Sequence, residues 1–136
     1  MHPGAVDRDH LAIGGFENGA NSWTGTTGAI GTWAAQPAFQ GTKNAWLCGD
    51  GKAATETLAQ TVTIPGTANA ATLSFQLHID SAETTSSTAY DKLAVSLLNA
   101  SGTPLKTLAT YSNLNKAAGY QVRTFDVSEY RGQTVQ

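Results

Sequence analysis

The stretch that decides the fold is "ATLSFQLHIDSAETTSSTAYDKLAVSLLN", residues 71–99, in which an alternating apolar run lies on each side of a polar segment. Apolar residues occupy every second position from Leu73 to Ile79, and again from Leu93 to Leu97. A period of two is typical of half-buried β-strands, because successive side chains of a strand point to opposite faces. The sequence therefore predicts two strands joined by a polar loop, with His78 on the outward face.

Further strands are predicted on both sides of this stretch. "NASG", residues 99–102, is a turn signal, and "TPLKTLATY", residues 103–111, then forms the second arm of an antiparallel hairpin. "ETLAQTVTIPG", residues 56–66, predicts one strand that ends at Pro65-Gly66. One face of that strand carries Leu58, Gln60, Val62 and Ile64.

The two ends of the chain have weaker patterns. In "YQVRTFDVSEY", residues 120–130, the apolar phase changes between Val122 and Phe125, which predicts a bulge or a strand end. "LNKAAGY", residues 114–120, has room for one helical turn. The first fifty residues are Gly-rich with scattered apolar anchors, and "NAWLCG", residues 44–49, is a candidate buried strand. Many short strands without helical crossovers favour an antiparallel β-sandwich.

Composition narrows the class of protein. The 136 residues, of which 40% are hydrophobic, fit one domain with a single core. Only 13% of the residues are charged, and the formal net charge is -2. Such a chain has no basic stripe for a phosphate backbone, so nucleic acid is not an expected partner. No apolar run approaches the roughly 20 residues of a membrane span, so no membrane association is expected.

The N-terminus and the single cysteine carry little functional signal. Residues 1–12 lack a charged region followed by an apolar core, so no signal peptide is visible, and we interpret them as a linker or an expression-vector remnant. The domain is then expected to span residues 13–136. A single cysteine cannot form an internal disulfide, and zinc-site spacings are absent. Cys48 is interpreted as a small buried hydrophobe in "AWLC" rather than a reactive thiol.

Several spaced motifs resemble one known family. They are "GGFENGANSWTG" (14–25), "AWLCGDGKAATETLAQTVTIP" (45–65), the stretch 71–99, "LATYSN" (108–113) and "YQVRTFDVSEYRGQTV" (120–135). Together they resemble the jelly-roll domain at the C-terminal end of secreted bacterial peptidases, which is related in shape to galactose-binding-like carbohydrate-binding modules. The resemblance implies an all-β, antiparallel jelly-roll β-sandwich. It also implies an extracellular, non-catalytic accessory module beside a parent enzyme domain, with structural calcium and sometimes glycan or surface binding.

The chain departs from that family in two places. Cys48 stands where the family often has Gly. After "YRGQTV" the family pattern continues through further strands, whereas the sequence here stops at Gln136. The jelly roll is therefore expected to lack its last strand or strands and to leave a slot beside its first strand. Unpaired backbone groups in such a slot could accept a complementary C-terminal β-strand or peptide as partner.

Acidic residues are the candidate metal ligands. Asp80, Glu83 and Asp91 cluster in the polar loop, and Ca²⁺ takes six to eight oxygen ligands of this kind. The alternative is that these carboxylates are solvated and that Asp80 and Glu83 cap turns. The resemblance implies that Glu17 ligates calcium together with an aspartate of the terminal strand. Asp50 in "CGDGK" is a further candidate, although "DG" is also an ordinary tight-turn signature.

Aromatic residues are the candidate glycan ligands, because lectin-like sites stack an aromatic ring on a pyranose. Trp33, Tyr90 and Tyr111 are the candidates, with Trp33 as easily a core residue. No catalytic residues are predicted, because no nucleophile elbow, zinc-binding helix or phosphate-binding loop is present. The expected function is a non-catalytic accessory module of a secreted bacterial enzyme. The alternatives are a carbohydrate-binding lectin-like domain and a module completed by a partner β-strand.

Overall fold

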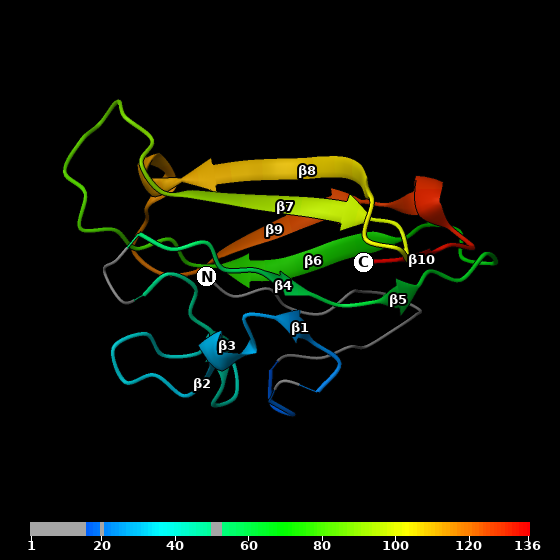
Figure 1. The fold of residues 1–136 in the computed structure, drawn as a ribbon, viewed down its shortest axis with the longest axis horizontal. Helices are drawn as coiled ribbons and strands as arrows, with labels where there is room; N and C mark the ends of the chain where they lie inside the picture. Colours follow the sequence, from blue (N-terminus) through cyan, green and yellow to red (C-terminus); the bar gives the residue numbers. More distant parts are fainter. Residues whose placement is uncertain (1–15, 20, 50–52) are drawn as a thin grey trace.

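The computed structural model describes residues 16–19, 21–49 and 53–136, and the chain is all-β in this part (Figure 1). The predicted linker 1–12 and the first residues of the predicted domain lie outside the described residues. The strands are β1 (Thr24–Gly25), β2 (Ile30–Gly31), β3 (Asn44–Ala45), β4 (Leu58–Ala59), β5 (Val62–Thr63), β6 (Thr72–Leu77), β7 (Lys92–Leu98), β8 (Pro104–Ser112), β9 (Gln121–Asp126) and β10 (Thr134–Val135). Three 3-10 turns are interspersed: η1 (Thr27–Ala29), η2 (Asn113–Asn115) and η3 (Ser128–Tyr130).

The predicted hairpin is confirmed, with β7 and β8 pairing antiparallel from Lys92↔Ser112 to Leu98↔Pro104. The side chain of Asn99 holds the turn, since its Oδ1 accepts hydrogen bonds of 2.9 Å from the backbone N–H groups of both Ser101 and Thr103. Two bulges interrupt the ladder, and both extra residues lie on β8. The alternation of side chains along β7 is therefore regular.

The predicted change of phase near the C-terminal end is wrong. β9 pairs with β6 without interruption, from Thr72↔Asp126 to Leu77↔Gln121. Val122 lies on the outward face and is 57% exposed, while Arg123 and Phe125 take the inward positions. The guanidinium carbon of Arg123 lies 5.2 Å from the centre of the Tyr111 ring, and the aromatic face allows a cation to occupy an inward position.

The single strand predicted over residues 56–66 is divided into β4 and β5, with Gln60 and Thr61 between them. The two halves have different partners, because β4 pairs with β1 and β5 pairs with β10, each antiparallel. Ile64 is buried as predicted, and Leu58 and Val62 are half-buried. The expected inward face is thus retained across the interruption.

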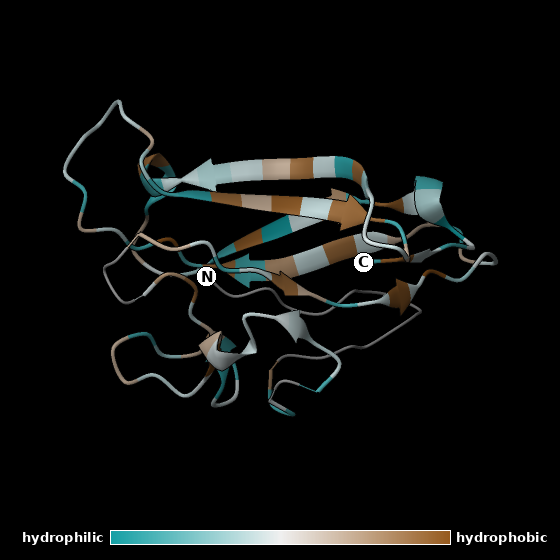
Figure 2. Ribbon diagram, in the orientation of Figure 1, coloured by the Kyte–Doolittle hydropathy of each residue, from teal (hydrophilic) through white to brown (hydrophobic). Residues whose placement is uncertain are grey.

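The apolar core lies between the β6–β9 and β7–β8 pairs. Figure 2 shows apolar residues alternating along β6 and β7. One buried cluster consists of Phe75, Leu77 and Ile79, with Leu93 and Val95 of β7 packed against it. A second cluster joins Ile64, Ala71, Leu97, Val127 and Val135. The all-β class is therefore established by strands that alternate as the sequence predicts.

The N-terminal third is built from two-residue strands and aromatic contacts. The predicted buried strand 44–49 is reduced to β3, whose two residues are both buried. The interpretation of Cys48 as buried is wrong, because this thiol is exposed and its residue has a φ of 53° in the left-handed region. Glycine adopts that conformation readily, so a residue with a side chain is strained at this position. Among the described residues, no helix is long and apolar enough to cross a bilayer.

Candidate functional site

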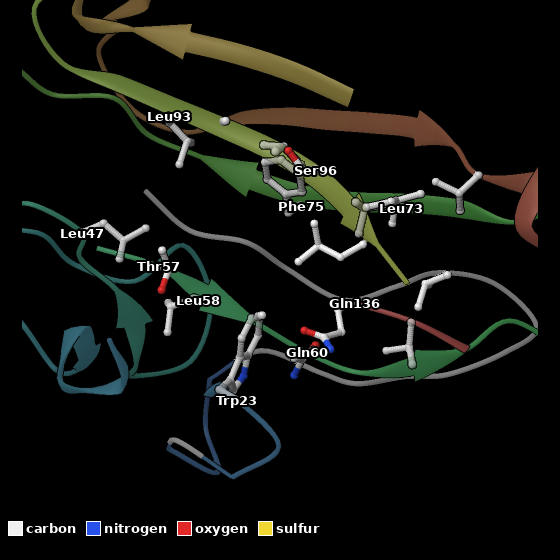
Figure 3. Close-up of a pocket in the computed structure, with 18 of the residues that line it drawn as sticks. Trp23, Leu47, Thr57, Leu58, Gln60, Leu73, Phe75, Leu93, Ser96 and Gln136 are labelled. Atoms are coloured by element: carbon white, nitrogen blue, oxygen red, sulfur yellow. The ribbon is translucent and has the colours of Figure 1, made fainter. Parts of the chain in front are cut away.

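An apolar groove lies between β4 and β7, with a cavity of about 360 Å³ (Figure 3). Figure 3 shows Leu47, Leu58 and Trp23 on one side of the cavity and Leu93 and Phe75 on the other. Most of its lining is aliphatic or aromatic, and Glu56 is the one charged residue among the described lining residues. The groove therefore suits an uncharged, apolar occupant.

The C-terminal strand fills one end of this groove. Val135 of β10 is buried and pairs with Val62 of β5 on one side, and it forms an isolated antiparallel bridge with Asn99 on the other. Leu98 and Gln136 exchange two backbone hydrogen bonds of 2.8 Å. β10 thus joins β5 to the end of β7 over two residues, and Val135 and Gln136 line the cavity at this end.

From Leu98 back toward the start of β7, one edge of this strand faces the groove. In an antiparallel strand, alternate residues direct their N–H and C=O groups to opposite edges. Because Leu98 directs both groups to Gln136 and the alternation along β7 is regular, Ser96 and Ala94 direct theirs to the same edge. Both residues are exposed and line the cavity. This edge can continue the ladder that β10 begins.

Gln60 is a polar exception in the groove lining. It lies in the interruption between β4 and β5, and Figure 3 shows it at the same end of the cavity as Gln136. Its Nε2 is buried and has no hydrogen-bond partner among the described residues. A buried amide donor without an acceptor is destabilising.

The structure does not bring the predicted calcium ligands of the polar loop together. Asp80 accepts a 2.9 Å hydrogen bond from the side chain of Gln36. The contact at Glu83 is made by its backbone carbonyl, which accepts from Lys116 Nζ at 2.7 Å. Among residues 16–19, 21–49 and 53–136, no three His, Cys, Asp or Glu side chains are grouped to hold a metal ion. Asp50 lies outside the described residues.

The loop that carries Tyr90 and Asp91 is held by one buried amide, that of Asn113. Its Oδ1 accepts from the backbone N–H groups of Tyr90 at 2.8 Å and Asp91 at 3.2 Å, and its Nδ2 donates to the Thr88 carbonyl at 3.0 Å. Only 3% of Asn113 is exposed. Asp91 is therefore positioned by its backbone, and its carboxylate is exposed at the start of β7.

Glu17 acts as a clamp between two segments. Its carboxylate accepts hydrogen bonds from the backbone N–H groups of Thr42 and Lys43, both at 2.8 Å, and from the Thr42 hydroxyl at 3.1 Å. The backbone N–H of Thr42 contributes most, followed by that of Lys43, to holding the pKa of the Glu17 carboxyl below its ordinary value of 4.5. The resemblance implies that Glu17 is a calcium ligand, and that stays a prediction. In the structure its oxygens hold residues 16–19 against the loop before β3.

The clamp predicts a specific loss of stability in acid. A carboxyl with a depressed pKa stabilises the fold above the pKa of the unfolded chain, and the contribution is lost as pH falls through the folded pKa. The Glu17→Gln variant should therefore melt a few degrees below wild type at pH 7, and the difference should shrink as pH falls below about 4.5. Thermal melts of both proteins across this range test it, and a difference independent of pH would contradict it.

The three predicted glycan ligands have different surroundings. Trp33 is half-buried, its ring lies edge-on to Trp46 at 5.8 Å, and its Nε1 donates to the Ala29 carbonyl. Tyr111 is half-buried beneath Arg123. Tyr90 is 63% exposed in the loop before β7.

A different aromatic group was missed by the sequence analysis. Phe39 is 54% exposed and lies edge-on to Tyr120 at 5.4 Å, and the Tyr120 ring lies 5.6 Å from the ring of His78. These three residues come from three distant parts of the chain, so no local pattern could have grouped them. His78 was predicted on the outward face, and it is half-buried beside Tyr120.

Comparisons with known proteins supply no relative. No family model, no curated protein and no solved structure matches the chain. The functional interpretation therefore depends on the geometry of the groove and on the chemistry of its lining.

Proposed function

We propose that this chain is a non-catalytic interaction module with a jelly-roll β-sandwich fold, which binds an extended β-strand of a separate polypeptide. The observation that carries the proposal is the apolar groove between β4 and β7, which continues from β10 along an edge of β7 where Ala94 and Ser96 pair with no strand among the described residues. Strand addition to a sheet edge provides affinity through backbone hydrogen bonds and specificity through pockets for alternate side chains. The groove offers both kinds of contact.

β10 is an example of what the groove accepts. Val135 points inward and is buried, while Thr134 is exposed. Its backbone pairs with β5 and its successor Gln136 pairs with Leu98, so a strand fits between these two elements. An occupant with the same alternation of apolar and polar residues would repeat these contacts further along the groove.

The module is proposed to act beside a catalytic domain of a secreted bacterial enzyme, as the sequence resemblance implies. Calcium binding and glycan binding also stay predictions of that resemblance. If a glycan is bound, the exposed ring of Phe39 beside Tyr120 offers a stacking surface, with the Gln36–Asp80 pair as polar groups. The groove supports strand binding more directly, because it supplies a shaped cavity together with a backbone edge that no described strand pairs with.

Two peptides of equal composition test strand binding. One alternates Thr and Ile over six residues, and the other places the three Ile residues in a block; both end in two lysines for solubility. We expect the alternating peptide to bind at least about tenfold more tightly, because only a period of two places three apolar side chains in the groove. Calorimetry measures affinity, and hydrogen exchange should show protection of the Ala94 and Ser96 amides.

A variant of β7 provides the matched control. Ser96→Pro removes an N–H that faces the groove, and proline is tolerated where that N–H is not needed for an existing ladder. We expect it to weaken binding at least about fivefold, whereas Ser96→Ala should bind as wild type does. Equal affinity for both peptides, or protection of amides elsewhere without protection at Ala94 and Ser96, would rule out strand addition in this groove.

A further inference from the structure

We infer that the bound strand pairs with β4 as well as with β7, so that it lies inside one continuous sheet in the order β1, β4, bound strand, β7, β8. This inference rests on the proposed function and specifies its partner: an extended segment with a backbone N–H at every position, and therefore without proline. Two observations support it: the hydrogen bonds that show which edge of β4 faces the groove, and the pairing of β10 on both of its sides.

One edge of β4 is occupied by β1, and the other faces the groove. Gly25 of β1 lies opposite Leu58. The Thr57 carbonyl accepts from the backbone N–H of Thr26 at 2.6 Å, and the Thr57 N–H donates to the Thr26 hydroxyl at 3.0 Å. Because alternate residues of a strand direct their backbone groups to opposite edges, Leu58 directs its N–H and C=O away from β1. Leu58 lines the cavity (Figure 3), and among the described residues β4 pairs with β1 alone.

The pairing of β5 gives the same assignment independently. Gln136 directs its N–H and C=O to Leu98, so the preceding Val135 directs its own to the opposite edge, where it pairs with Val62 of β5. Val62 follows Leu58 by four residues, and the alternation predicts the same edge for both. The interruption between β4 and β5 therefore leaves one backbone edge that runs from β10 along the groove.

β10 shows that the space between the two edges is one strand wide where β10 enters it. Val135 lies opposite Val62 on one side and opposite Asn99 on the other. Neighbouring strands lie about 4.8 Å apart, so a single strand in this position reaches the backbone groups of both neighbours. A bound strand that continues this register has Leu58 on one side and residues 94–96 of β7 on the other. It is antiparallel to both strands.

The register also connects the face of each bound residue with the edge that it serves. Beyond Gln136, the first residue of such a strand lies opposite Gln60 and the third lies opposite Leu58. Side-chain direction and hydrogen-bonding edge both alternate with a period of two. Inward residues therefore direct their N–H groups to β4, as Val135 directs its own to β5. Outward residues direct theirs to β7, as Gln136 does to Leu98.

The test removes single N–H groups from the alternating Thr-Ile peptide. An N-methyl group on a central Ile removes a donor that faces β4, and one on a central Thr removes a donor that faces β7. A shift of the peptide by two residues leaves these assignments unchanged, because both alternations have the same period. We expect each change to weaken binding at least about fivefold, since it removes a hydrogen bond and places a methyl group between two strands. N-methylation of the last lysine, outside the groove, is the matched control and should leave the affinity unchanged.

Hydrogen exchange provides a second measurement, and the outcomes separate this inference from the proposed function. The unmodified peptide should slow exchange of the Leu58 amide as well as those of Ala94 and Ser96. If the methyl group on Ile has no effect, or if exchange at Leu58 is not slowed, the strand adds to β7 alone: the proposed function stands and this inference is wrong. If the unmodified peptide does not bind, or if the methyl group on Thr has no effect, both proposals fail.

Discussion

A six-residue extension after Gln136 with the sequence Thr-Thr-Val-Thr-Val-Thr is expected to raise the melting temperature by about 8 °C. The register of β10 directs the third and fifth added residues into the groove, where two Val side chains leave water. The gain combines the burial of two Val side chains with the backbone hydrogen bonds that the extension makes to its neighbours on both sides, and the entropy of ordering the extension opposes it. A net gain of about 2 kcal/mol corresponds to roughly that shift for a domain of this size.

The matched control has the same composition in the opposite phase, Thr-Val-Thr-Val-Thr-Thr. Both extensions begin with Thr opposite Gln60, so they differ only in whether Val points into the groove or into solvent. A one-residue change of phase exchanges the two faces of a strand, and we expect no stabilisation from the control. Calorimetric melts of the two fusions measure the difference. Equal melting temperatures would show that a strand does not continue the register of β10.

Replacing Asn113 by Leu is expected to destabilise the fold by about 3 kcal/mol or more. The substitution leaves the N–H groups of Tyr90 and Asp91 and the carbonyl of Thr88 without their hydrogen-bond partner. Three hydrogen bonds are lost, and each contributes about 1 kcal/mol to the net stability. Urea denaturation measures the loss, and the amides of Tyr90 and Asp91 should exchange faster than in the wild type.

Asn113→Asp separates the two kinds of contact. The carboxylate keeps an acceptor for the two N–H groups and loses the donor that reaches Thr88. We expect an intermediate loss of stability, with faster exchange confined to the residues around Thr88. If Asn113→Leu were as stable as wild type, the buried amide would not be what holds this loop.

The long strands are the part of the fold that the sequence predicted well. The alternation over residues 71–99 and the "NASG" turn correspond to β6, β7 and β8, because each strand is apolar on one face. The prediction failed at β9, where Arg123 occupies an inward position that a hydropathy pattern assigns to Val122. Stacking of a cation on Tyr111 depends on a strand elsewhere in the sequence, so local periodicity could not reveal it.

The candidate site was less predictable than the strands. Leu58, Gln60 and Val95 were predicted on inward faces, and they do line the cavity. Their location in a groove depends on which strands become neighbours, and that pairing is not encoded in any local window. The polar loop shows the converse: Asp80, Glu83 and Asp91 are close in sequence, but no three His, Cys, Asp or Glu side chains of the described residues are grouped to hold a metal ion.

The nested order of the strands has a consequence for folding kinetics. β6 and β9 pair across more than forty intervening residues, whereas β7 and β8, which lie between them in the sequence, are joined by a short turn. Hairpins form in about 1–10 µs, and closing a longer loop loses more chain entropy. Once β7 and β8 have paired, the segment that β6 and β9 must close is effectively shorter. We therefore expect the hairpin to form early and the β6–β9 ladder to limit the folding rate.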